Sequence, residues 1–220
     1  IAGRGSLRSI NPMPDVPRAV LFDFGGVIAD EGFHQGLYAL ADRLGLDRVQ
    51  VMEACGEAIY ASGYITGRGS ETDFWHAFRA RIPFIESGDA LRADILARFQ
   101  LRPRMVQLVR RLRNAGTRCA LVSDQVDWLD RLDARDHFYR EFDRLYVSYR
   151  LGKGKRDPTL FDDIVADLGV RPCEALLLDD NAGNIERARS RGLSAWLFTD
   201  EAACLAQFAA ILGDSREMTA

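Results

Sequence analysis

The second half of this chain alternates short apolar segments with helical segments, and this alternation constrains the fold more than any other feature. After Pro103, apolar residues at helical spacing predict a helix that ends before Gly116. Strands are then predicted at 119–123, 144–148, 174–180 and 194–198, and helices at 160–168, 181–191 and 201–212. Strands that alternate with helices through short loops form a parallel sheet with helices on both of its faces.

One more strand is predicted near the start of the chain, and a helical insertion separates it from the others. Residues 18–24 form a short apolar run that two glycines end. From residue 31 to residue 100 the apolar residues recur at helical spacing, without a convincing strand. We therefore predict an α/β protein with a Rossmann-like parallel sheet built from residues 18–30 and 101–220. Residues 31–100 are predicted to form a helical cap.

Composition and charge exclude several classes of protein. The 220 residues are 47% hydrophobic and 28% charged, which is typical of a soluble globular protein. The formal net charge is −3, and we expect no nucleic-acid partner because binding to phosphate backbones needs a basic face. No apolar run approaches the roughly 18 residues of a membrane span. The four cysteines form no CxxC pair, which favours reduced thiols in a cytoplasmic protein.

The first residues are expected to lie outside the folded part. Residues 1–17 carry glycines and prolines without periodicity, and we expect a flexible tail. This segment lacks the apolar stretch of a signal peptide, and its first six residues look like a remnant of cloning or of a protease site. The sequence gives no indication of the oligomeric state.

Acidic and polar side chains occur where the predicted strands end. Asp23 ends the first strand, Ser123 and Asp124 end the second, and Asp179 and Asp180 end the fourth. Because ligands bind at the carboxyl ends of the strands in an open parallel sheet, we expect these side chains to lie together at a binding site. A basic loop, LGKGKRD at 151–157, lies between the last two of these strand ends in the sequence.

These residue types suit phosphate chemistry. Carboxylates that lie close together raise each other's pKa, and a divalent cation relieves the repulsion. Ligands that are all oxygen atoms suit Mg²⁺. A serine hydroxyl and a lysine ammonium can donate to a phosphoryl group, and glycines let backbone N–H groups approach an anion. An ionised aspartate can attack phosphorus and form an aspartyl-phosphate.

Four segments resemble the four motifs of the haloacid dehalogenase (HAD) superfamily in order and spacing. They read LFDFGGVIAD at 21–30, LVSD at 121–124, LGKGKRDPTLF at 151–161 and LLLDDNAGNIERA at 176–188. The resemblance covers about residues 18–200, and the helical insertion corresponds to the α-helical cap of that family. The first and last segments are similar to the branch that holds sugar-1-phosphatases and the phosphatase domain of soluble epoxide hydrolases.

The resemblance implies a Mg²⁺-dependent phosphatase that hydrolyses a small phosphorylated metabolite. Asp23 would be the nucleophile and a Mg²⁺ ligand. The backbone carbonyl of Gly25 and the carboxylate of Asp179 would be further ligands. Asp180 would bind the metal directly or through water.

The same resemblance implies how the phosphoryl group is held. Ser123 and Lys155 would bind its oxygens, and Lys155 would also balance the charge of the carboxylates. Asp124, which stands where the family usually has Asn, belongs to the same substrate-binding segment. Asn184 would orient the loop that carries the acidic pair. A smaller departure is Arg156, where proline usually follows the motif lysine.

The departure that matters most is at Gly25. Phosphatases of this family have an aspartate there, two residues after the nucleophile, and it acts as general acid and base. General acid–base catalysis typically raises the rate of a reaction by roughly 10²–10⁴-fold. Another group must supply it, or the substrate must have a leaving group that needs little protonation. Asp30, Glu31 and His34 at the start of the cap are the nearest candidates.

Other interpretations of these residues stay open at this stage. Ser123 can simply cap the next helix, Lys153 competes with Lys155 for the role of motif lysine, and the acidic pair at 179–180 can be a structural turn. Phe74, Trp75 and Phe78 indicate the core of the cap more than a platform for substrate. The histidines, His34 included, are more typical of surface or packing positions.

Three other functions are compatible with the family. The dehalogenase branch is metal-free and lacks an acidic pair in its last motif, so Asp179 and Asp180 argue against cleavage of a carbon–halogen bond. The phosphonatase branch uses a cap lysine, and residues 31–100 contain none. The third alternative is a binding protein whose catalytic power is weakened by the glycine at position 25.

Overall fold

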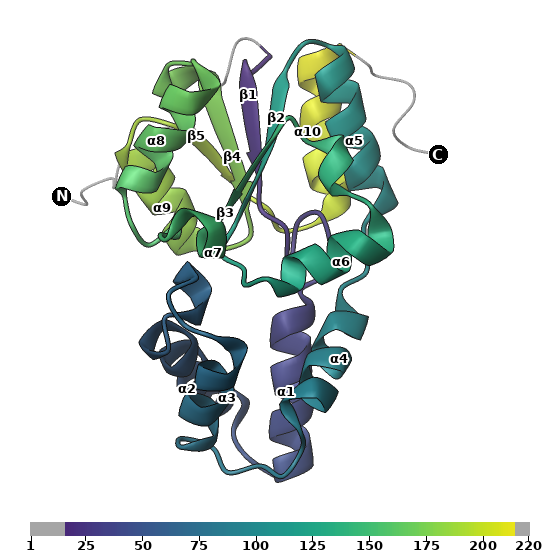
Figure 1. Ribbon diagram of the computed structural model, residues 1–220. Helices are drawn as coiled ribbons and strands as arrows, with labels where there is room; N and C mark the ends of the chain where they lie inside the picture. The colour runs from purple at the N-terminus through teal and green to yellow at the C-terminus, as the bar shows by residue number, and fades with distance from the viewer. Residues whose placement is uncertain (1–15, 214–220) are drawn as a thin grey trace, which may run out of the picture.

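The computed structural model describes residues 16–213, in which five strands form one parallel sheet (Figure 1). The order of the strands is β3-β2-β1-β4-β5, and each neighbouring pair is parallel. The strands are β1 (Ala19–Phe22), β2 (Arg118–Ser123), β3 (Arg144–Val147), β4 (Ala175–Asp179) and β5 (Ser194–Leu197). The predicted α/β class with a Rossmann-like parallel sheet is confirmed. Residues 1–15 of the predicted tail lie outside the described residues.

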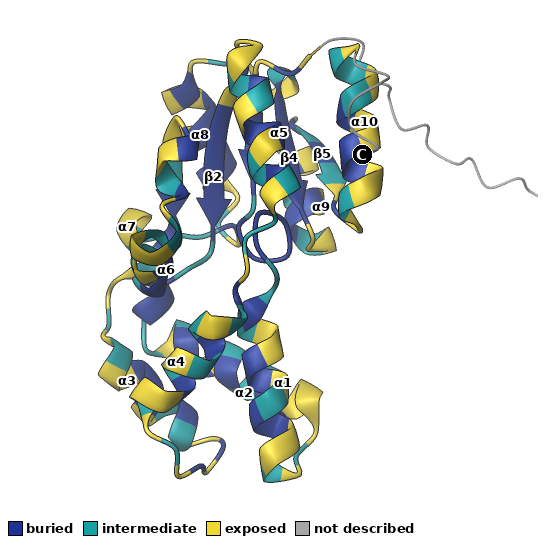
Figure 2. Cartoon of the chain, turned by 90° about the vertical axis from the view of Figure 1, so that its right-hand side faces the viewer, coloured by how far each residue is buried: buried dark blue, intermediate teal, exposed yellow. Residues whose placement is uncertain are grey.

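Helices cover both faces of the sheet (Figure 1). One face is covered by α5 (Pro103–Asn114) and α10 (Glu201–Leu212), and the other by α8 (Thr159–Leu168) and α9 (Ala182–Ser190). Val20 and Phe22 of β1 face the first pair of helices, whereas Leu21 faces the second. Each of these side chains is fully buried, which is worth about 1.5–3 kcal/mol per large apolar group. In Figure 2 strand β4 is buried along its whole length, and β2 is buried except for Arg118 at its start.

Four helices of residues 31–100 lie together beyond the C-terminal edge of the sheet (Figures 1 and 2). They are α1 (Gly32–Leu44), α2 (Arg48–Ala61), α3 (Glu71–Arg79) and α4 (Gly88–Arg98). Helix α1 packs against α4, and α2 packs against α3. Phe74, Trp75 and Phe78 are buried inside this group of helices, as a core position requires. We propose that residues 31–100 form a cap domain over the sheet edge.

The chain enters and leaves these helices through two segments that lie side by side. The N–H of Asp30 donates to the carbonyl of Gln100 at 2.9 Å, and the N–H of Arg102 donates to the carbonyl of Ile28 at 2.9 Å. Ala29 forms isolated bridges to both Gly25 and Leu101. These bonds hold the segment before α1 against the segment that follows α4.

Two short helices after β2 and β3 were absent from the prediction. Helix α6 (Trp128–Asp136) lies between the sheet edge and the cap helices, and α7 (Ser148–Leu151) follows β3 directly (Figure 1). Ser148 begins α7 and is not the last residue of a strand. Among residues 16–213, no helix combines the length and the apolar character that crossing a membrane requires.

Candidate active site

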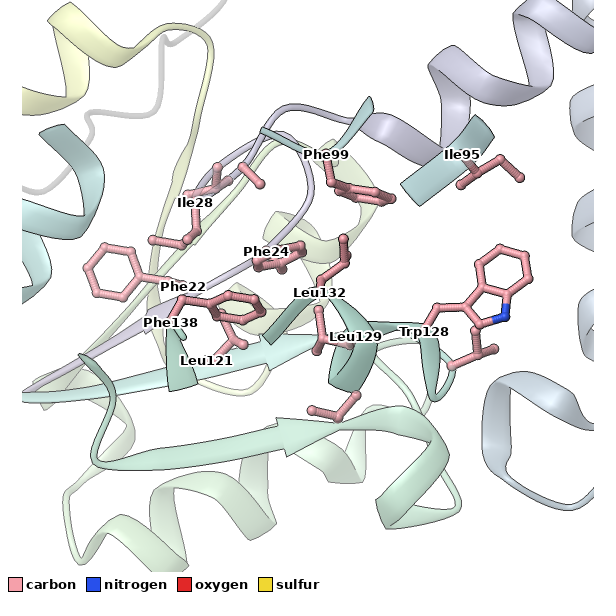
Figure 3. Close-up of a cluster of buried hydrophobic side chains, with 14 of the residues drawn as sticks. Phe22, Phe24, Ile28, Ile95, Phe99, Leu121, Trp128, Leu129, Leu132 and Phe138 are labelled. Carbon is pink, nitrogen blue, oxygen red and sulfur yellow. The ribbon is translucent and has the colours of Figure 1, made fainter. Parts of the chain in front are cut away.

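Asp23 directly follows β1, and its neighbour Phe24 anchors it. The N–H of Asp23 donates to the carbonyl of Leu178 at 3.0 Å, which continues the pairing of β1 with β4. The N–H of Phe24 donates to Oδ1 of Asp23 at 2.7 Å. The ring of Phe24 enters the apolar cluster of Figure 3, where it stacks on Phe138 at 4.6 Å and on Phe99 at 5.7 Å between centroids. This packing fixes the backbone beside the Asp23 carboxylate.

Lys155 joins two of the strand ends through buried ion pairs. Its Nζ lies 2.8 Å from Oδ1 of Asp23 and 2.6 Å from Oδ2 of Asp179, and the side chain is 1% exposed. Asp124 holds the lysine loop, because its Oδ1 accepts from the N–H of Lys155 at 2.8 Å. Burial alone would lower the pKa of Lys155. Attraction from Asp23 and Asp179 outweighs burial and raises it, so the side chain stays charged.

Asp179 is held from several directions at the end of β4. Nδ2 of Asn184 donates to both of its carboxylate oxygens at 3.0 Å, and the N–H of Asn181 donates to Oδ1 at 2.8 Å. Asn184 reaches Asp179 because α9 begins directly after the acidic pair and Asn181 caps its first turn. The Asp179 carboxylate is fully buried, and these hydrogen bonds satisfy its oxygens, as a buried polar group requires.

Three carboxylates converge at this edge of the sheet. One oxygen each of Asp23, Asp179 and Asp180 lies within 4.8 Å of the other two. Burial raises the pKa of Asp23 well above its usual value, attraction from Lys155 opposes the rise, and repulsion from Asp179 adds to it. Burial and then repulsion from Asp179 also raise the pKa of Asp180. One lysine faces three carboxylates, and this excess of oxygen ligands and negative charge fits a divalent cation such as Mg²⁺.

Gly26 allows the acidic pair to approach the loop after β1. Its φ is +79°, and a Cβ atom at this position would lie 2.0 Å from Oδ2 of Asp180. A side chain at position 26 would therefore be strained by its backbone conformation and would also displace the Asp180 carboxylate.

A cavity of about 330 Å³ opens over these groups, and both the sheet and the cap helices contribute to its walls. Asp23, Ser123, Lys155 and Asp180 line its floor, with Ser123 itself 3% exposed. Apolar residues from the cap side complete the wall: Phe33, Met52, Ile59 and Ile65. The volume suits a small molecule.

Tyr60, Arg156 and Arg187 are among the lining residues of this cavity that were absent from the predicted site. Tyr60 of α2 lies under the guanidinium of Arg156, which is 4.0 Å from the centre of the ring. Arg187 follows Asn184 by one turn of α9, and its Nη2 donates to Oδ1 of Asn184 at 2.6 Å. Spacing on α9 could have suggested Arg187, but no sequence signal indicates which face of α2 carries Tyr60 toward the site.

The two lysines of the motif loop have different partners. Nζ of Lys153 donates to Oγ1 of Thr159 at 2.8 Å and pairs with Asp163 at the surface. Only Lys155 reaches the aspartates at the strand ends.

A larger cavity of about 640 Å³ lies at the opposite end of β2 and β3, where arginines such as Arg113 pair with acidic neighbours such as Asp143. None of the predicted site residues lines it.

The three candidates for the missing acid and base are placed differently. Asp30 is half-exposed and pairs with Arg102 at 3.1 Å. His34 lies at the mouth of the cavity and is exposed. The carboxylate of Glu31 lies against Gly25, where a Cβ atom would be 2.2 Å from Oε2. Burial raises the pKa of Glu31, and attraction from His34 opposes the rise.

The family model for haloacid dehalogenase-like hydrolases matches residues 17–192. The chain belongs to this family. Among curated relatives, Bifunctional epoxide hydrolase 2 of Rattus norvegicus is 30% identical over 116 residues, which are 50% of this chain and 21% of the relative. D-ribitol-5-phosphate phosphatase of Bacteroides thetaiotaomicron is 42% identical over 50 residues, which are 23% of this chain and 24% of the relative. The chain thus aligns with less than a quarter of the length of either relative.

Solved structures of HAD enzymes share the fold. A predicted HAD-like hydrolase from Porphyromonas gingivalis has a TM-score of 0.68 at 19% identity, with 92% of this chain and all of the other covered. A HAD family enzyme from Bacteroides thetaiotaomicron in complex with magnesium and inorganic phosphate has a TM-score of 0.62 at 19% identity, with 81% and 92% covered. L-2-haloacid dehalogenase from Xanthobacter autotrophicus has a TM-score of 0.61 at 17% identity, with 88% and 82% covered. At these identities the likeness establishes the fold alone.

Proposed function

We propose that this HAD hydrolase is a Mg²⁺-dependent phosphatase that hydrolyses a small phosphorylated metabolite through an aspartyl-phosphate on Asp23. The observation that carries the proposal is the convergence of Asp23, Asp179 and Asp180 within 4.8 Å beside the buried Lys155. Three carboxylates and one ammonium need a further positive charge. A metal ion would supply that charge, and Lys155 and Ser123 can donate to the oxygens of a phosphoryl group.

In the proposed reaction the Asp23 carboxylate attacks phosphorus and the bond from phosphorus to the leaving oxygen breaks. Phe24 and the pairing of β1 keep the nucleophile in place. The ammonium of Lys155 and the hydroxyl of Ser123 hold phosphoryl oxygens and stabilise their charge. Asp23, Asp179, Asp180 and the carbonyl of Gly25 would hold Mg²⁺. When bound, the ion would offset the repulsion between the carboxylates and the anionic substrate.

The relatives support this class of reaction and leave the substrate open. One relative is a phosphatase that is named for ribitol 5-phosphate, and a fold neighbour was crystallised with magnesium and inorganic phosphate. Fold neighbours also include a haloacid dehalogenase. Hydrolysis of a haloacid needs a nucleophilic carboxylate but no dication. Two additional carboxylates beside Asp23 favour the phosphatase over that alternative.

A panel of phosphate monoesters tests the proposal, assayed with Mg²⁺ and again with EDTA. We expect turnover of at least one ester with Mg²⁺, and its loss in EDTA and in Asp23→Asn. Lys153→Met is the matched control, because Lys153 lies outside the cavity and pairs with Asp163 at the surface. Metal-independent release of halide from haloacids would contradict the proposal, as would phosphatase activity that survives in Asp23→Asn.

A further inference from the structure

The pocket holds a carboxylate that the proposed metal site and the lysine loop do not use. Four carboxylate residues line the pocket within residues 16–213: Asp23, Glu31, Asp124 and Asp180. Asp23 is the proposed nucleophile, Asp180 belongs to the acidic cluster, and Asp124 accepts from the N–H of Lys155. Glu31 remains, and its Oε2 is the polar atom that a side chain at position 25 would meet first, 2.2 Å from the ideal Cβ.

We infer that Glu31 is the general acid and base of this enzyme and that its carboxyl group does the work of the side chain that Gly25 lacks. The inference rests on the proposed function. The position of the Glu31 carboxylate supports this assignment. Residue 25 is two residues beyond the nucleophile, and the Glu31 carboxylate fills the space in which a side chain at position 25 would begin. Gly25 has no positive φ that would require glycine. The structural reason for glycine at this position is room for Glu31.

Local structure holds Glu31 in this position. It is the N-cap of α1, and its Oε1 accepts from the N–H of His34 at 3.2 Å. That bond turns Oε2 toward Gly25. The bond from Asp30 to Gln100 and the bridges of Ala29 fix the backbone just before it. Just after it, Gly32 packs so closely on Phe99 that a Cβ would lie 2.5 Å from the ring. The acid is therefore held by the same loop that carries Asp23.

The proposed reaction has two chemical steps. Protonated Glu31 gives its proton to the leaving oxygen as the bond between phosphorus and that oxygen breaks and the bond from Asp23 to phosphorus forms. The alcohol departs and Glu31 is left as a carboxylate. Glu31 then takes a proton from water while the water oxygen attacks phosphorus and the bond to Asp23 breaks, which returns the electron pair to the Asp23 carboxylate. Phosphate is released and Glu31 is protonated again.

The test compares two substrates with the chain of 220 residues. Glu31→Gln keeps an acceptor for the cap bond to His34 but cannot donate the proton of a carboxylic acid. For an alkyl phosphate we expect kcat/KM to fall by roughly 10²–10⁴-fold, because the alkoxide leaves only when protonated. For nitrophenyl phosphate we expect a fall of less than about tenfold, because nitrophenolate leaves without a proton and kcat/KM reports the first chemical step.

Matched variants separate the chemistry from capping and folding. Asp47→Asn makes the same change from carboxylate to amide at the N-cap of α2, away from the cavity, and should leave both substrates unaffected. Gly25→Asp in a Glu31→Ala background should raise alkyl-phosphate turnover above that of Glu31→Ala alone. Equal losses on both substrates in Glu31→Gln, or no loss on the alkyl ester, would overturn the inference. Absence of any Asp23-dependent turnover in the wild type would instead contradict the proposed function.

Discussion

Replacing Lys155 with Met removes the buried cation between two carboxylates, and we expect a large loss of stability in the metal-free protein. Lys155 is 1% exposed and lies within 2.8 Å of both Asp23 and Asp179. Removing one partner of a buried ion pair costs about 3–5 kcal/mol, because the remaining charges stay buried without compensation. In a protein of this length the melting temperature should fall by roughly 6–20 °C.

Lys153→Met is the matched control for this prediction. Lys153 is the other lysine of the same loop, and the side chain of its partner Asp163 is 63% exposed. A surface pair of this kind contributes about 0–1 kcal/mol. Thermal and urea unfolding followed by circular dichroism in EDTA measure both variants. If Lys155→Met loses no more stability than Lys153→Met, the buried ion pairs do not have the importance that we assign to them.

The pH dependence of the same variant has a definite sign. Burial raises the pKa of Asp23, and Lys155 opposes that rise, so the pKa should rise further without the lysine. A carboxyl group with a raised folded pKa stabilises the fold below its unfolded pKa, and this contribution is lost as the pH rises through the folded pKa. We therefore expect the stability deficit of Lys155→Met in EDTA to be smaller at about pH 5 than at about pH 8. A deficit that grows toward acid would contradict this assignment.

Three further predictions concern the metal site, the loop after β1 and the thiols. Asp179→Asn should weaken Mg²⁺ binding measured by calorimetry, because a hard cation loses an anionic ligand, and unchanged affinity would count against the site. Gly26→Ala should lower the free energy of unfolding by about 1–3 kcal/mol, since it forces a side chain into φ +79° and against Asp180; an unchanged urea midpoint would show that the loop adapts. Cys173 is exposed, whereas the other three cysteines are buried. A thiol reagent should therefore modify one thiol rapidly in the native protein and none in Cys173→Ser, and rapid reaction of a second thiol would contradict the described burial.

The three central strands β1, β2 and β4 were predictable because each is mainly an apolar run that is buried on both faces of the sheet. β1 and β4 show this most clearly, since all of their residues are buried. Helix α6 was missed because five of its nine residues are aspartate or arginine, none of them buried, so its apolar stripe is short. It is nevertheless anchored firmly by Trp128, which is 2% exposed and stacks on Trp75 of the cap at 5.7 Å. A contact between distant segments leaves no local pattern.

Parts of the site followed from topology, and other parts required packing. The carboxyl ends of parallel strands meet at one edge, so the proximity of Asp23 to Asp179 could be expected from the sequence. Sequence spacing alone left Lys153 and Lys155 as competitors for the role of motif lysine. The hydrogen bond from the Lys155 N–H to the Asp124 side chain could not be predicted from the sequence. The choice of Glu31 among three nearby candidates for the general acid and base depends on the direction of its side chain, and only the folded loop determines that direction.

Whether Asp23 accepts the phosphoryl group can be determined from a crystal structure of the protein with Mg²⁺ and beryllium fluoride. Beryllium fluoride mimics a phosphoryl group bound to a carboxylate. We expect beryllium bonded to the Asp23 carboxylate, with Lys155 and Ser123 contacting the fluorides and Mg²⁺ held by Asp179. Beryllium fluoride bound elsewhere, with Asp23 unmodified and still paired with Lys155, would contradict this expectation.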